Sequence, residues 1–241
     1  MSSLFISDLH LVGERPAITD LFLHFTKTIA PRAQALYILG DLFEYWIGDD
    51  NTDDTLAAVV ADTLKRLSSS GVKVFLMQGN RDVLLGPGFA DQSGAELIDD
   101  PTLINLYGRP TLLTHGDALC IEDIEYQKFR EYARSPMHQQ QFLTQSLETR
   151  RERMLQMRAQ SEMSKQQKDL EIMDVTTSAV DQLLRNHHYP NIIHGHTHRP
   201  ARHEHDVDGH RCERWVLTDW YQTGGYLLCD ASGCYSHKLS Q

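Results

Sequence analysis

The chain has 241 residues, a formal net charge of −10 with its histidines counted as neutral, and a hydrophobic share of 41%. This length fits one α/β domain with an insertion or two small domains, and the hydrophobic share suffices for a core without covalent staples. The negative charge argues against a general nucleic-acid binder, because such proteins gain much of their affinity from Lys and Arg contacts to phosphates. A metal enzyme is not excluded, since bound cations supply positive charge locally.

The cysteines and the hydropathy pattern indicate a cytosolic protein. No close pair among the four cysteines has metal-ligand spacing, so we expect four reduced thiols at Cys120, Cys212, Cys229 and Cys234. The opening residues lack a basic stretch followed by an apolar one, so we expect no signal peptide. No stretch approaches the roughly 20 apolar residues that a membrane-spanning helix needs.

Strands and helices alternate in the first half of the sequence. Apolar runs at residues 4–7, 36–39 and 72–77 predict buried strands, and amphipathic stretches at 16–29 and 55–67 predict helices between them. This alternation is typical of βαβ units and of a largely parallel sheet. Further strands are predicted at 111–114 and 191–194, and short antiparallel strands at about 201–238, with turns around Asp208-Gly209, Gly224-Gly225 and Ser232-Gly233.

Residues 123–188 differ from the rest of the chain. The segment is poor in glycine, rich in Gln, Glu, Arg and Met, and has helical periodicity. We therefore predict a helical cap at 123–188, inserted into an α/β core that residues 1–122 and 189–241 form.

Five polar clusters each follow a predicted strand directly. The carboxyl ends of strands in an open α/β sheet form the crevice where ligands bind, so clusters far apart in sequence are expected to meet in space. The clusters are Asp8-Leu9-His10, Gly40-Asp41, Gly79-Asn80-Arg81-Asp82, His115-Gly116-Asp117 and His194-Gly195-His196-Thr197-His198.

The side chains in these clusters are suited to divalent metal ions. Carboxylates, imidazoles and one amide oxygen, with no thiolate, favour Mn²⁺, Fe²⁺, Zn²⁺ or Mg²⁺. Asp8 and His10 lie two residues apart at the end of a strand, and His196 and His198 repeat this spacing. Seven candidate ligands are too many for one tetrahedral site but suit two ions that share a carboxylate, for which Asp41 is the natural candidate.

Each cluster also has an ordinary structural interpretation. Asp-x-His after a strand is commonly a loop with a helix cap, and Gly-Asp is common turn chemistry. Asn80 can cap a turn, and His115 can be a satisfied buried histidine. His-Gly-His-Thr-His is by itself more typical of a metal site, and the occurrence of all five clusters after five strands favours a shared metal centre.

In this order the motifs resemble those of the calcineurin-like metallophosphoesterases, from Asp8 to His198. The resemblance implies a β-sandwich core flanked by helices and two bound Mn²⁺ ions, with other divalent cations as alternatives. Water activated by the two ions is then the nucleophile that attacks phosphorus. The implied ligands are Asp8, His10, Asp41 and His198 for one metal, and Asp41, Asn80, His115 and His196 for the other.

One position departs from the general family pattern. The family usually has a histidine after the asparagine, where it is thought to assist the leaving group, but this sequence has Arg81. Arginine is a poor proton donor and an excellent clamp for phosphate oxygens. Because a phosphate leaving group is already stable as an anion, Arg81 favours a pyrophosphate substrate over a monoester or diester.

Longer stretches narrow the resemblance to the pyrophosphatases of Gram-negative lipid A synthesis. They include Leu-Phe-Ile-Ser-Asp-Leu-His-Leu, Gly-Asn-Arg-Asp-Val-Leu-Leu-Gly and Ile-His-Gly-His-Thr-His-Arg-Pro. The resemblance implies cleavage of UDP-2,3-diacylglucosamine by water attack on the α-phosphorus, which gives 2,3-diacylglucosamine 1-phosphate (lipid X) and UMP. It also implies a cytoplasmic protein that is peripheral on the inner membrane. We expect a monomer without a nucleic-acid partner, and the preferred acyl-chain length stays open.

The predicted cap has both kinds of surface that a lipidated sugar nucleotide needs. Its alternative interpretation is a solvated face beside an ordinary apolar core stripe. Six basic residues stand against two acidic ones between positions 150 and 168, namely Arg150, Arg151, Arg153, Arg158, Lys165 and Lys168. Neighbouring apolar residues are Phe142, Leu143, Leu147, Met154, Leu155 and Met157.

By resemblance, several residues also have roles in binding and catalysis. Lys165 stands where a relative has an asparagine, although a lysine there can still bind a phosphate or hydroxyl. The implied substrate contacts are Asn80, Arg81, Asp123, Ser161, Lys165, Lys168 and His196. The implied catalytic residues are Asn80, Arg81, His115 and His196.

Two other functions fit part of the pattern. A general phosphodiesterase or phosphomonoesterase would use the same metal ligands, but it would require neither Arg81 nor the amphipathic cap. A non-catalytic scaffold with this fold would typically have lost ligands, whereas all seven candidates are present. No metal is assigned to the remaining histidines of the tail and of the end of the cap, His203, His205, His210, His237, His187 and His188.

Overall fold

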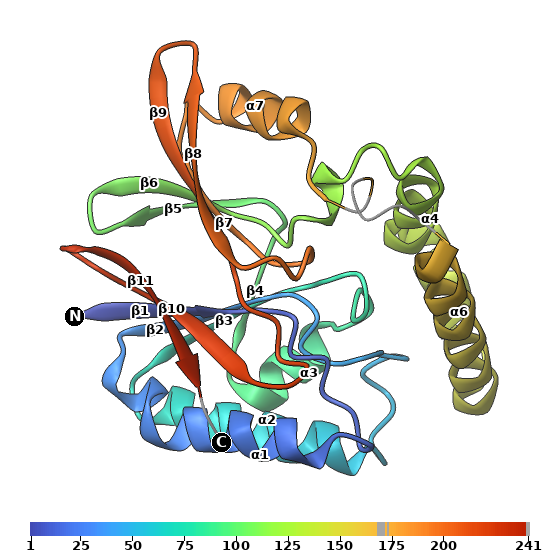
Figure 1. Cartoon of the computed structure of the whole chain (residues 1–241). Coiled ribbons are helices and arrows are strands. Elements are labelled where there is room, and N and C mark those ends of the chain that lie inside the picture. The colour runs from blue at the N-terminus through green and yellow to red at the C-terminus, as the bar shows by residue number, and fades with distance from the viewer. Residues whose placement is uncertain (168–171, 173, 240–241) are drawn as a thin grey trace.

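The computed structural model describes residues 1–167, 172 and 174–239. Within this part of the chain two β-sheets stack face to face, with helices on their outer sides (Figure 1). The six-stranded sheet has the order β11-β10-β1-β2-β3-β4. Its strands are β1 (Ser2–Ile6), β2 (Ala35–Leu39), β3 (Lys73–Met77), β4 (Glu96–Ile98), β10 (Gly224–Asp230) and β11 (Gly233–Leu239).

The second sheet has five strands in the order β5-β6-β7-β9-β8. Strands β1 to β4 of the first sheet are mutually parallel, as are β6, β7 and β9 of the second. The strands of the second sheet are β5 (Thr102–Leu106), β6 (Arg109–Leu113), β7 (Asn191–His194), β8 (Ala201–Val207) and β9 (His210–Val216). Two stacked sheets with flanking helices confirm the predicted α/β class.

The continuous apolar runs of the first strands are explained by burial on both faces of the sheet. In β1, Leu4 and Ile6 pack toward the helices α1 (Pro16–Thr28) and α2 (Thr55–Ser69), whereas Phe5 packs between the sheets. Successive side chains of a strand point to opposite faces, so a doubly covered strand must be apolar at every position. The predicted strands and helices of the first half are thereby confirmed.

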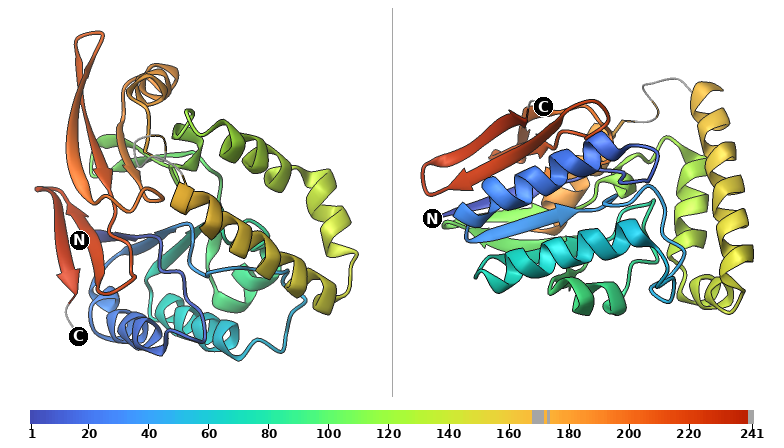
Figure 2. Two further views of the ribbon diagram at one scale, coloured as in Figure 1. Left: turned by 45° about the vertical axis from the view of Figure 1, so that its right-hand side comes forward. Right: turned by 90° about the horizontal axis from the view of Figure 1, so that it is seen from below.

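The helices of the predicted insert lie beside the sandwich, as the yellow-green segments of Figure 2 show. They are α4 (Ile124–Arg134), α5 (Pro136–Leu143) and α6 (Leu147–Gln167), and neither α4 nor α5 has a buried residue. The next helix, α7 (Thr177–Asn186), instead packs on the five-stranded sheet through Val180 and Leu184. Among the described residues, no helix combines the length and apolar character required to cross a membrane.

Two sequence expectations are wrong. Gly224-Gly225 is not a turn but the start of β10, where a Cβ on Gly224 would lie 2.9 Å from the Trp220 ring, so close packing is what requires glycine. The expectation of four reduced thiols fails for Cys229 and Cys234, which form a disulfide. They are paired opposite each other in the β10–β11 hairpin, with Cα atoms 4.1 Å apart.

Short elements between the predicted ones were not anticipated. Strands β4 and β5 and the helix α3 (Pro87–Ser93) have no periodicity long enough to be read from sequence. The turn at Asp208-Gly209 is confirmed, with positive φ at both residues, and the turn at Ser232 links β10 to β11. Cys120 and Cys212 are buried thiols.

Candidate metal centre

The candidate ligands lie together where the carboxyl ends of the parallel strands of both sheets meet. Strands β1, β2 and β3 are parallel neighbours in one sheet, and β6 and β7 are parallel neighbours in the other. The loops that follow them are joined by backbone hydrogen bonds, from the Asp8 N–H to the Gly40 carbonyl (3.1 Å) and from the Gly195 N–H to the His115 carbonyl (3.0 Å). Parallel strands therefore bring all seven candidates to one edge, as the strand-end argument predicts.

The backbone is strained at five of the seven candidates. A left-handed conformation costs an L-residue about 1–2 kcal/mol, and such residues concentrate at functional sites, where the surrounding structure holds them in place. Positive φ angles occur at Asp8 (55°), His10 (50°), Asp41 (53°), His196 (69°) and His198 (55°). The sharp turns direct these side chains away from the strands and toward the centre.

One group of ligand atoms consists of Asp8, His10 and His198, which lie within 4.8 Å of one another. The His198 Nε2 is 3.3 Å and the His10 Nε2 is 4.0 Å from the Asp8 Oδ1. The Nε2 atoms of the two rings are 3.4 Å apart. One carboxylate and two imidazoles converging on one point suit a divalent transition metal.

A second group surrounds His115. Asp8, Asp41 and His115 also offer ligand atoms within 4.8 Å of one another. The Asn80 Oδ1 lies 2.9 Å from the His115 Nε2 and 2.9 Å from the Nδ1 of His196. Carboxylate, imidazole and amide groups that can bind a metal thus form a second cluster.

Asp41 lies between the two groups. Its Oδ2 is 3.8 Å from the His10 Nε2, and its Oδ1 is 3.7 Å from the His115 Nε2. The two oxygens of one carboxylate therefore face different histidines. This is the arrangement that a bridging carboxylate requires.

The histidine rings are oriented by partners outside the centre. The His115 Nδ1 donates to the Leu39 carbonyl (2.9 Å), so the Nε2 is the nitrogen that faces the centre and the one that lacks a proton whenever the ring is neutral. The His10 Nδ1 is 3.5 Å from the Glu44 Oε2, and the His198 Nδ1 is 3.3 Å from the Asp219 Oδ2. Partners of this kind orient a ligand ring and raise its basicity. Sequence reasoning missed both carboxylates, because neither belongs to a strand-end motif.

Asp82 and Gly79 bring the loops after β2 and β3 together. The buried Asp82 carboxylate accepts hydrogen bonds from the backbone N–H groups of Asp41 (3.2 Å), Leu42 (2.8 Å) and Gly79 (2.8 Å). A Cβ on Gly79 would lie 2.1 Å from the Asp41 Oδ1. Likewise, a Cβ on Gly195 would lie 2.2 Å from the Asp8 Oδ2. Only glycine permits this approach of one loop to the other.

The electrostatics of the centre fit bound cations. Burial raises the pKa of Asp41 to about 7, although the neighbouring His115 lowers it. Burial lowers the pKa of His115, but the carboxylates of Asp41, Asp117 and Asp8 outweigh it and raise the value to about 9. Burial lowers the pKa of His196 to about 3. Several carboxylates crowded out of water are stabilised by positive charge, and their donor set fits divalent metal ions.

Two tyrosines complete the walls of the centre and were not identified from sequence. The Tyr221 ring lies 5.1 Å from the His10 ring and 5.2 Å from the His198 ring, measured between centroids. The Tyr126 ring lies 5.5 Å from that of His196, and its hydroxyl donates to Asp117 (3.1 Å). Aromatic residues carry no motif in one sequence, so only the fold reveals their position.

The predicted substrate contacts lie in different parts of the structure, some at the metal centre and some on the helices of the insert. Arg81 is buried beside the centre, where its backbone N–H donates to the Asp41 Oδ1 (2.8 Å). Asp123 caps α4 by accepting a hydrogen bond from the Tyr126 N–H (3.1 Å). Ser161 is half-buried on α6. Lys165 belongs to α6 but its side chain lies outside the described residues, as does Lys168 entirely.

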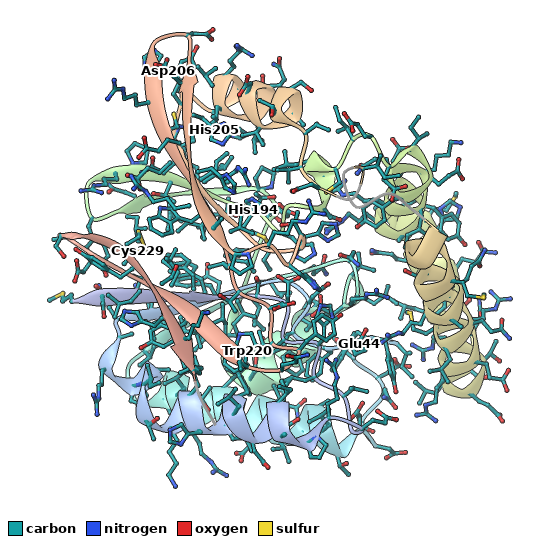
Figure 3. The ribbon with its side chains drawn as sticks, in the orientation of Figure 1. Glu44, His194, His205, Asp206, Trp220 and Cys229 are labelled. Carbon is teal, nitrogen blue, oxygen red and sulfur yellow. A yellow bond between two sulfur atoms is a disulfide. The ribbon has the colours of Figure 1, made fainter. Side chains whose placement is uncertain are left out.

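Two arginines of the predicted basic surface hold α6 against the core instead. Arg150 is buried, and its guanidinium donates to the Ile47 carbonyl (2.7 Å) and to the carboxylate of Asp50. Its inclusion in an open basic surface was therefore wrong. Arg158 donates to the Glu44 carbonyl (3.2 Å) and pairs with the Glu44 carboxylate. Figure 3 shows Glu44 on the side of the core that faces α6. Helix α6 thus contacts the same glutamate that lies beside His10.

The fold and the metal centre agree with a comparison to protein families. The model of the calcineurin-like phosphoesterases matches residues 1–200. The chain therefore belongs to the calcineurin-like phosphoesterase family and is a metal-dependent hydrolase.

Curated relatives match nearly the whole chain. The UDP-2,3-diacylglucosamine hydrolase of Aromatoleum aromaticum is 50% identical over 233 residues, which cover 97% of this chain and 95% of the relative. The enzyme of the same name from Stenotrophomonas maltophilia is 51% identical over 240 residues, with 97% and 96% covered. Among solved structures, an archaeal phosphodiesterase is 13% identical over 99% of this chain and 100% of its own, with a TM-score of 0.49.

Proposed function

We propose that this protein hydrolyses the pyrophosphate bond of UDP-2,3-diacylglucosamine in lipid A synthesis, with water attacking the α-phosphorus. The products are 2,3-diacylglucosamine 1-phosphate (lipid X) and UMP. The observation that carries the proposal is Arg81, a permanent cation buried at the metal centre where the general family pattern has a histidine. Two relatives named UDP-2,3-diacylglucosamine hydrolase, which are 50% and 51% identical to this chain, support the choice of substrate.

The seven candidates would hold two divalent cations, for which we propose Mn²⁺. The proposed ligands are Asp8, His10, Asp41 and His198 for one ion, and Asp41, Asn80, His115 and His196 for the other. When bound, such ions supply a nucleophile from water near neutral pH and withdraw negative charge from phosphate oxygens. The split of the Asp41 oxygens between His10 and His115 supports a shared ligand.

The chain's own groups have separate tasks in this reaction. Arg81 would bind oxygens of the diphosphate through its guanidinium and stabilise the charge that leaves with lipid X. No proton has to be delivered, because the leaving group is already a phosphate. The Leu39 carbonyl at the Nδ1 of His115 orients the ring so that its Nε2 faces the centre, where the neutral ring would offer this nitrogen as a metal ligand. Tyr126 and Tyr221 would exclude water from the sides of the site.

Helices α4 to α6 are the proposed substrate-binding cap, within the predicted segment 123–188. Seven of the thirteen large apolar side chains that are exposed in the described chain fall between positions 124 and 163. Concentrated apolar exposure marks a binding surface, and it suits two acyl chains. The seven are Ile124, Phe129, Tyr132, Met137, Leu143, Leu155 and Met163.

The cap would also contact the sugar nucleotide. The proposed contacts there are Asp123, Ser161, Lys165 and Lys168, beside Asn80, Arg81 and His196 at the metals. We assign α7 to the core because its apolar face is covered by the five-stranded sheet. Arg158 and Glu44 join α6 to the neighbourhood of His10, which supports a position of the proposed cap beside the proposed metals.

We also propose a monomer that binds peripherally to the cytoplasmic face of the inner membrane, and the lipid substrate and the apolar cap support the membrane contact. No nucleic acid is proposed as a partner. The protein should co-sediment with vesicles of native lipids. Replacement of two exposed cap residues by serine (Ile124→Ser with Met137→Ser) should release it, whereas Leu103→Ser, an exposed leucine on β5 outside the cap, should not. Protein that stays wholly in the supernatant would contradict the membrane assignment.

The reaction is tested with Mn²⁺-loaded protein and UDP-2,3-diacylglucosamine in ¹⁸O-water, followed by mass spectrometry of both products. Label in UMP is the expected result, since it places the attack on the α-phosphorus. Label in lipid X would reverse the proposed orientation of the diphosphate. Absence of turnover with metal bound, together with hydrolysis of bis(p-nitrophenyl) phosphate, would favour a general phosphodiesterase instead.

A further inference from the structure

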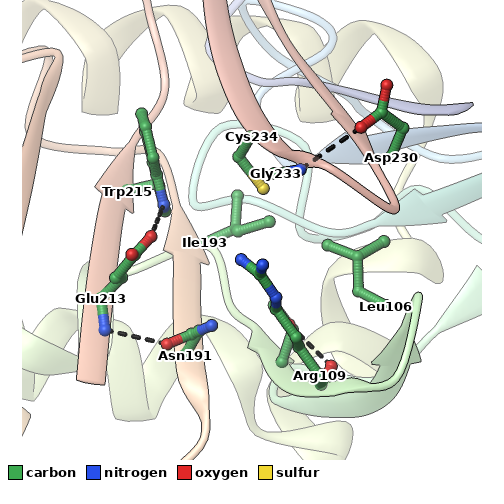
Figure 4. Close-up of a pocket in the computed structure, with 10 residues that line it drawn as sticks. Leu106, Arg109, Asn191, Ile193, Glu213, Trp215, Asp230, Gly233 and Cys234 are labelled. Carbon is green, nitrogen blue, oxygen red and sulfur yellow. Dashed lines mark hydrogen bonds between the residues drawn. The ribbon is translucent and has the colours of Figure 1, made fainter. Parts of the chain in front are cut away.

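Two buried polar residues lie on the outer face of the five-stranded sheet, and the proposed reaction does not use them. On the inner face, Ile193 of β7 and Trp215 of β9 are paired and line a cavity of about 10 Å³, which has room for no more than a water molecule (Figure 4). Successive side chains of a strand point to opposite faces, so His194 and Arg214 lie on the face that α7 covers. Both are buried, with exposed fractions of 0% and 7%.

Arg214 determines which ring nitrogen of His194 carries the proton. The Arg214 Nη1 donates to the His194 Nε2 (3.0 Å), and the Arg214 Nε donates to the His205 Nε2 (3.1 Å). Figure 3 shows both histidines in the region of the five-stranded sheet. A guanidinium stays protonated and has no acceptor atom, so the Nε2 of His194 accepts and carries no proton. The ring is therefore neutral, with its proton on Nδ1.

The Nδ1 of His194 holds the carbonyl group of the next residue. It donates to the Gly195 oxygen at 2.8 Å. The Thr197 N–H donates to the same oxygen (2.9 Å). One donor comes from the end of β7 and the other from the loop itself, and together they fix the direction of this carbonyl.

The peptide unit that contains this carbonyl also contacts a proposed metal ligand. Its N–H belongs to His196 and donates to both oxygens of the Asp8 carboxylate, at 3.1 and 2.9 Å. The unit is trans and planar, so its C=O and N–H point in opposite directions. Rotation of this plane would break the contacts on both of its sides. A donor at the Gly195 oxygen therefore also orients the N–H that holds Asp8.

We propose that His194, held by Arg214, is a positioning residue for the proposed divalent metal ions. Its Nδ1–H fixes the peptide between Gly195 and His196, and this peptide orients the Asp8 carboxylate and the start of the loop that carries the His196 ring. The inference rests on the proposed function, because it needs Asp8 and His196 to be metal ligands. His194 is not itself a proposed ligand and acts through the peptide. Loss of such an outer partner typically weakens metal binding about 10–100-fold.

Two substitutions at position 194 separate this role from simple burial. In His194→Asn the amide nitrogen can take the place of Nδ1 and still donate to the Gly195 carbonyl, whereas His194→Gln places its amide where Nε2 was. Both variants lose the ring and should melt at a lower temperature than the wild-type protein. Only His194→Gln should also weaken Mn²⁺ binding, by about 10–100-fold in a chelator competition. The matched control is His203→Gln, at an exposed histidine of β8 paired with Arg214 in the sheet, which should keep the wild-type affinity.

Hydrogen exchange at the His196 amide reports on the peptide directly. It is measured by mass spectrometry with fragmentation, at saturating Mn²⁺. Exchange should be faster in His194→Gln than in His194→Asn and the wild-type protein. Arg214→Met should weaken Mn²⁺ binding less than His194→Gln does, because the ring keeps its Nδ1–H but loses the contact that orients it. Arg214→Lys should restore the affinity, since an ammonium group can still donate to Nε2.

The outcomes distinguish this inference from the proposed function. Wild-type affinity and exchange in His194→Gln would overturn the positioning role and leave the proposed ligands in place, as would an equal loss of affinity in both variants at position 194. If His194→Gln failed to fold, unchanged affinity in Arg214→Met would overturn it instead. A wild-type protein that bound no Mn²⁺ would overturn the proposed metal centre itself. None of these measurements uses substrate, so failure to hydrolyse UDP-2,3-diacylglucosamine would leave the inference standing.

Discussion

The contact between Gly79 and Asp41 predicts that Gly79→Ala will disrupt the metal centre and destabilise the fold. The added Cβ would lie 2.1 Å from the Asp41 Oδ1 and 2.3 Å from the Asp41 backbone nitrogen, whereas non-bonded heavy atoms normally stay about 3.5 Å apart. The carboxylate can rotate away, but the nitrogen cannot, because its N–H is bonded to the buried Asp82. The loops after β2 and β3 must therefore separate by about 1 Å.

The expected cost follows from this overlap. Overpacking of a buried contact costs about 1–3 kcal/mol, which in a chain of this size lowers Tm by roughly 2–12 °C. Since Asp41 is the proposed shared ligand, the variant should also lose bound Mn²⁺. Gly13→Ala is the control, because no atom lies within 4 Å of its added Cβ.

Circular dichroism melting and elemental analysis of dialysed protein measure these two effects. Gly79→Ala should melt lower and hold less manganese than the wild-type protein, and Gly13→Ala should match the wild-type protein in both. A Gly79→Ala protein with unchanged metal content and a Tm within about 1 °C of the wild-type value would refute the argument from close approach.

Three other substitutions probe the surroundings of the centre. Asp219→Asn should weaken manganese binding about 10–100-fold in a chelator competition, because Asp219 orients the ring of His198; unchanged affinity would deny it that role. Arg150→Met should lower the free energy of unfolding in urea by about 1–3 kcal/mol, since it leaves a buried carbonyl unsatisfied, whereas the exposed Arg151→Met should be neutral. Burial lowers the pKa of His194 from 6.5 to about 3, so its neutral form stabilises the fold fully above pH 6.5 and progressively less as the pH falls toward 3. His194→Gln should therefore reduce the loss of unfolding free energy between pH 6.5 and 4.5 by roughly 1.4 kcal/mol per pH unit, and equal losses in both proteins would contradict the assignment.

Local sequence predicted much of the core and its metal-binding edge. The run Leu4-Phe5-Ile6 could be recognised as a doubly covered strand because a strand's side chains alternate between its two faces. Candidate ligands such as Asp8 and His198 could be found because each lies within four residues after the end of a buried strand, and parallel strands end at a common edge. These features depend on residues adjacent in the chain, which is why one sequence suffices to predict them.

Contacts between distant segments were decided only by the tertiary structure. Glu44 lies beside His10 and pairs with Arg158 on α6, and no local pattern distinguishes it from a surface glutamate. The burial of Arg150 likewise depends on where α6 lies against the loop after β2. Helix α7 joins the core although its composition matches the insert, because the five-stranded sheet offers an apolar face to Val180 and Leu184. Short-range periodicity determines whether a segment is a helix or a strand and which residues lie at its end. Packing between distant segments determines which side chain pairs with each charged residue and which surface covers each apolar face.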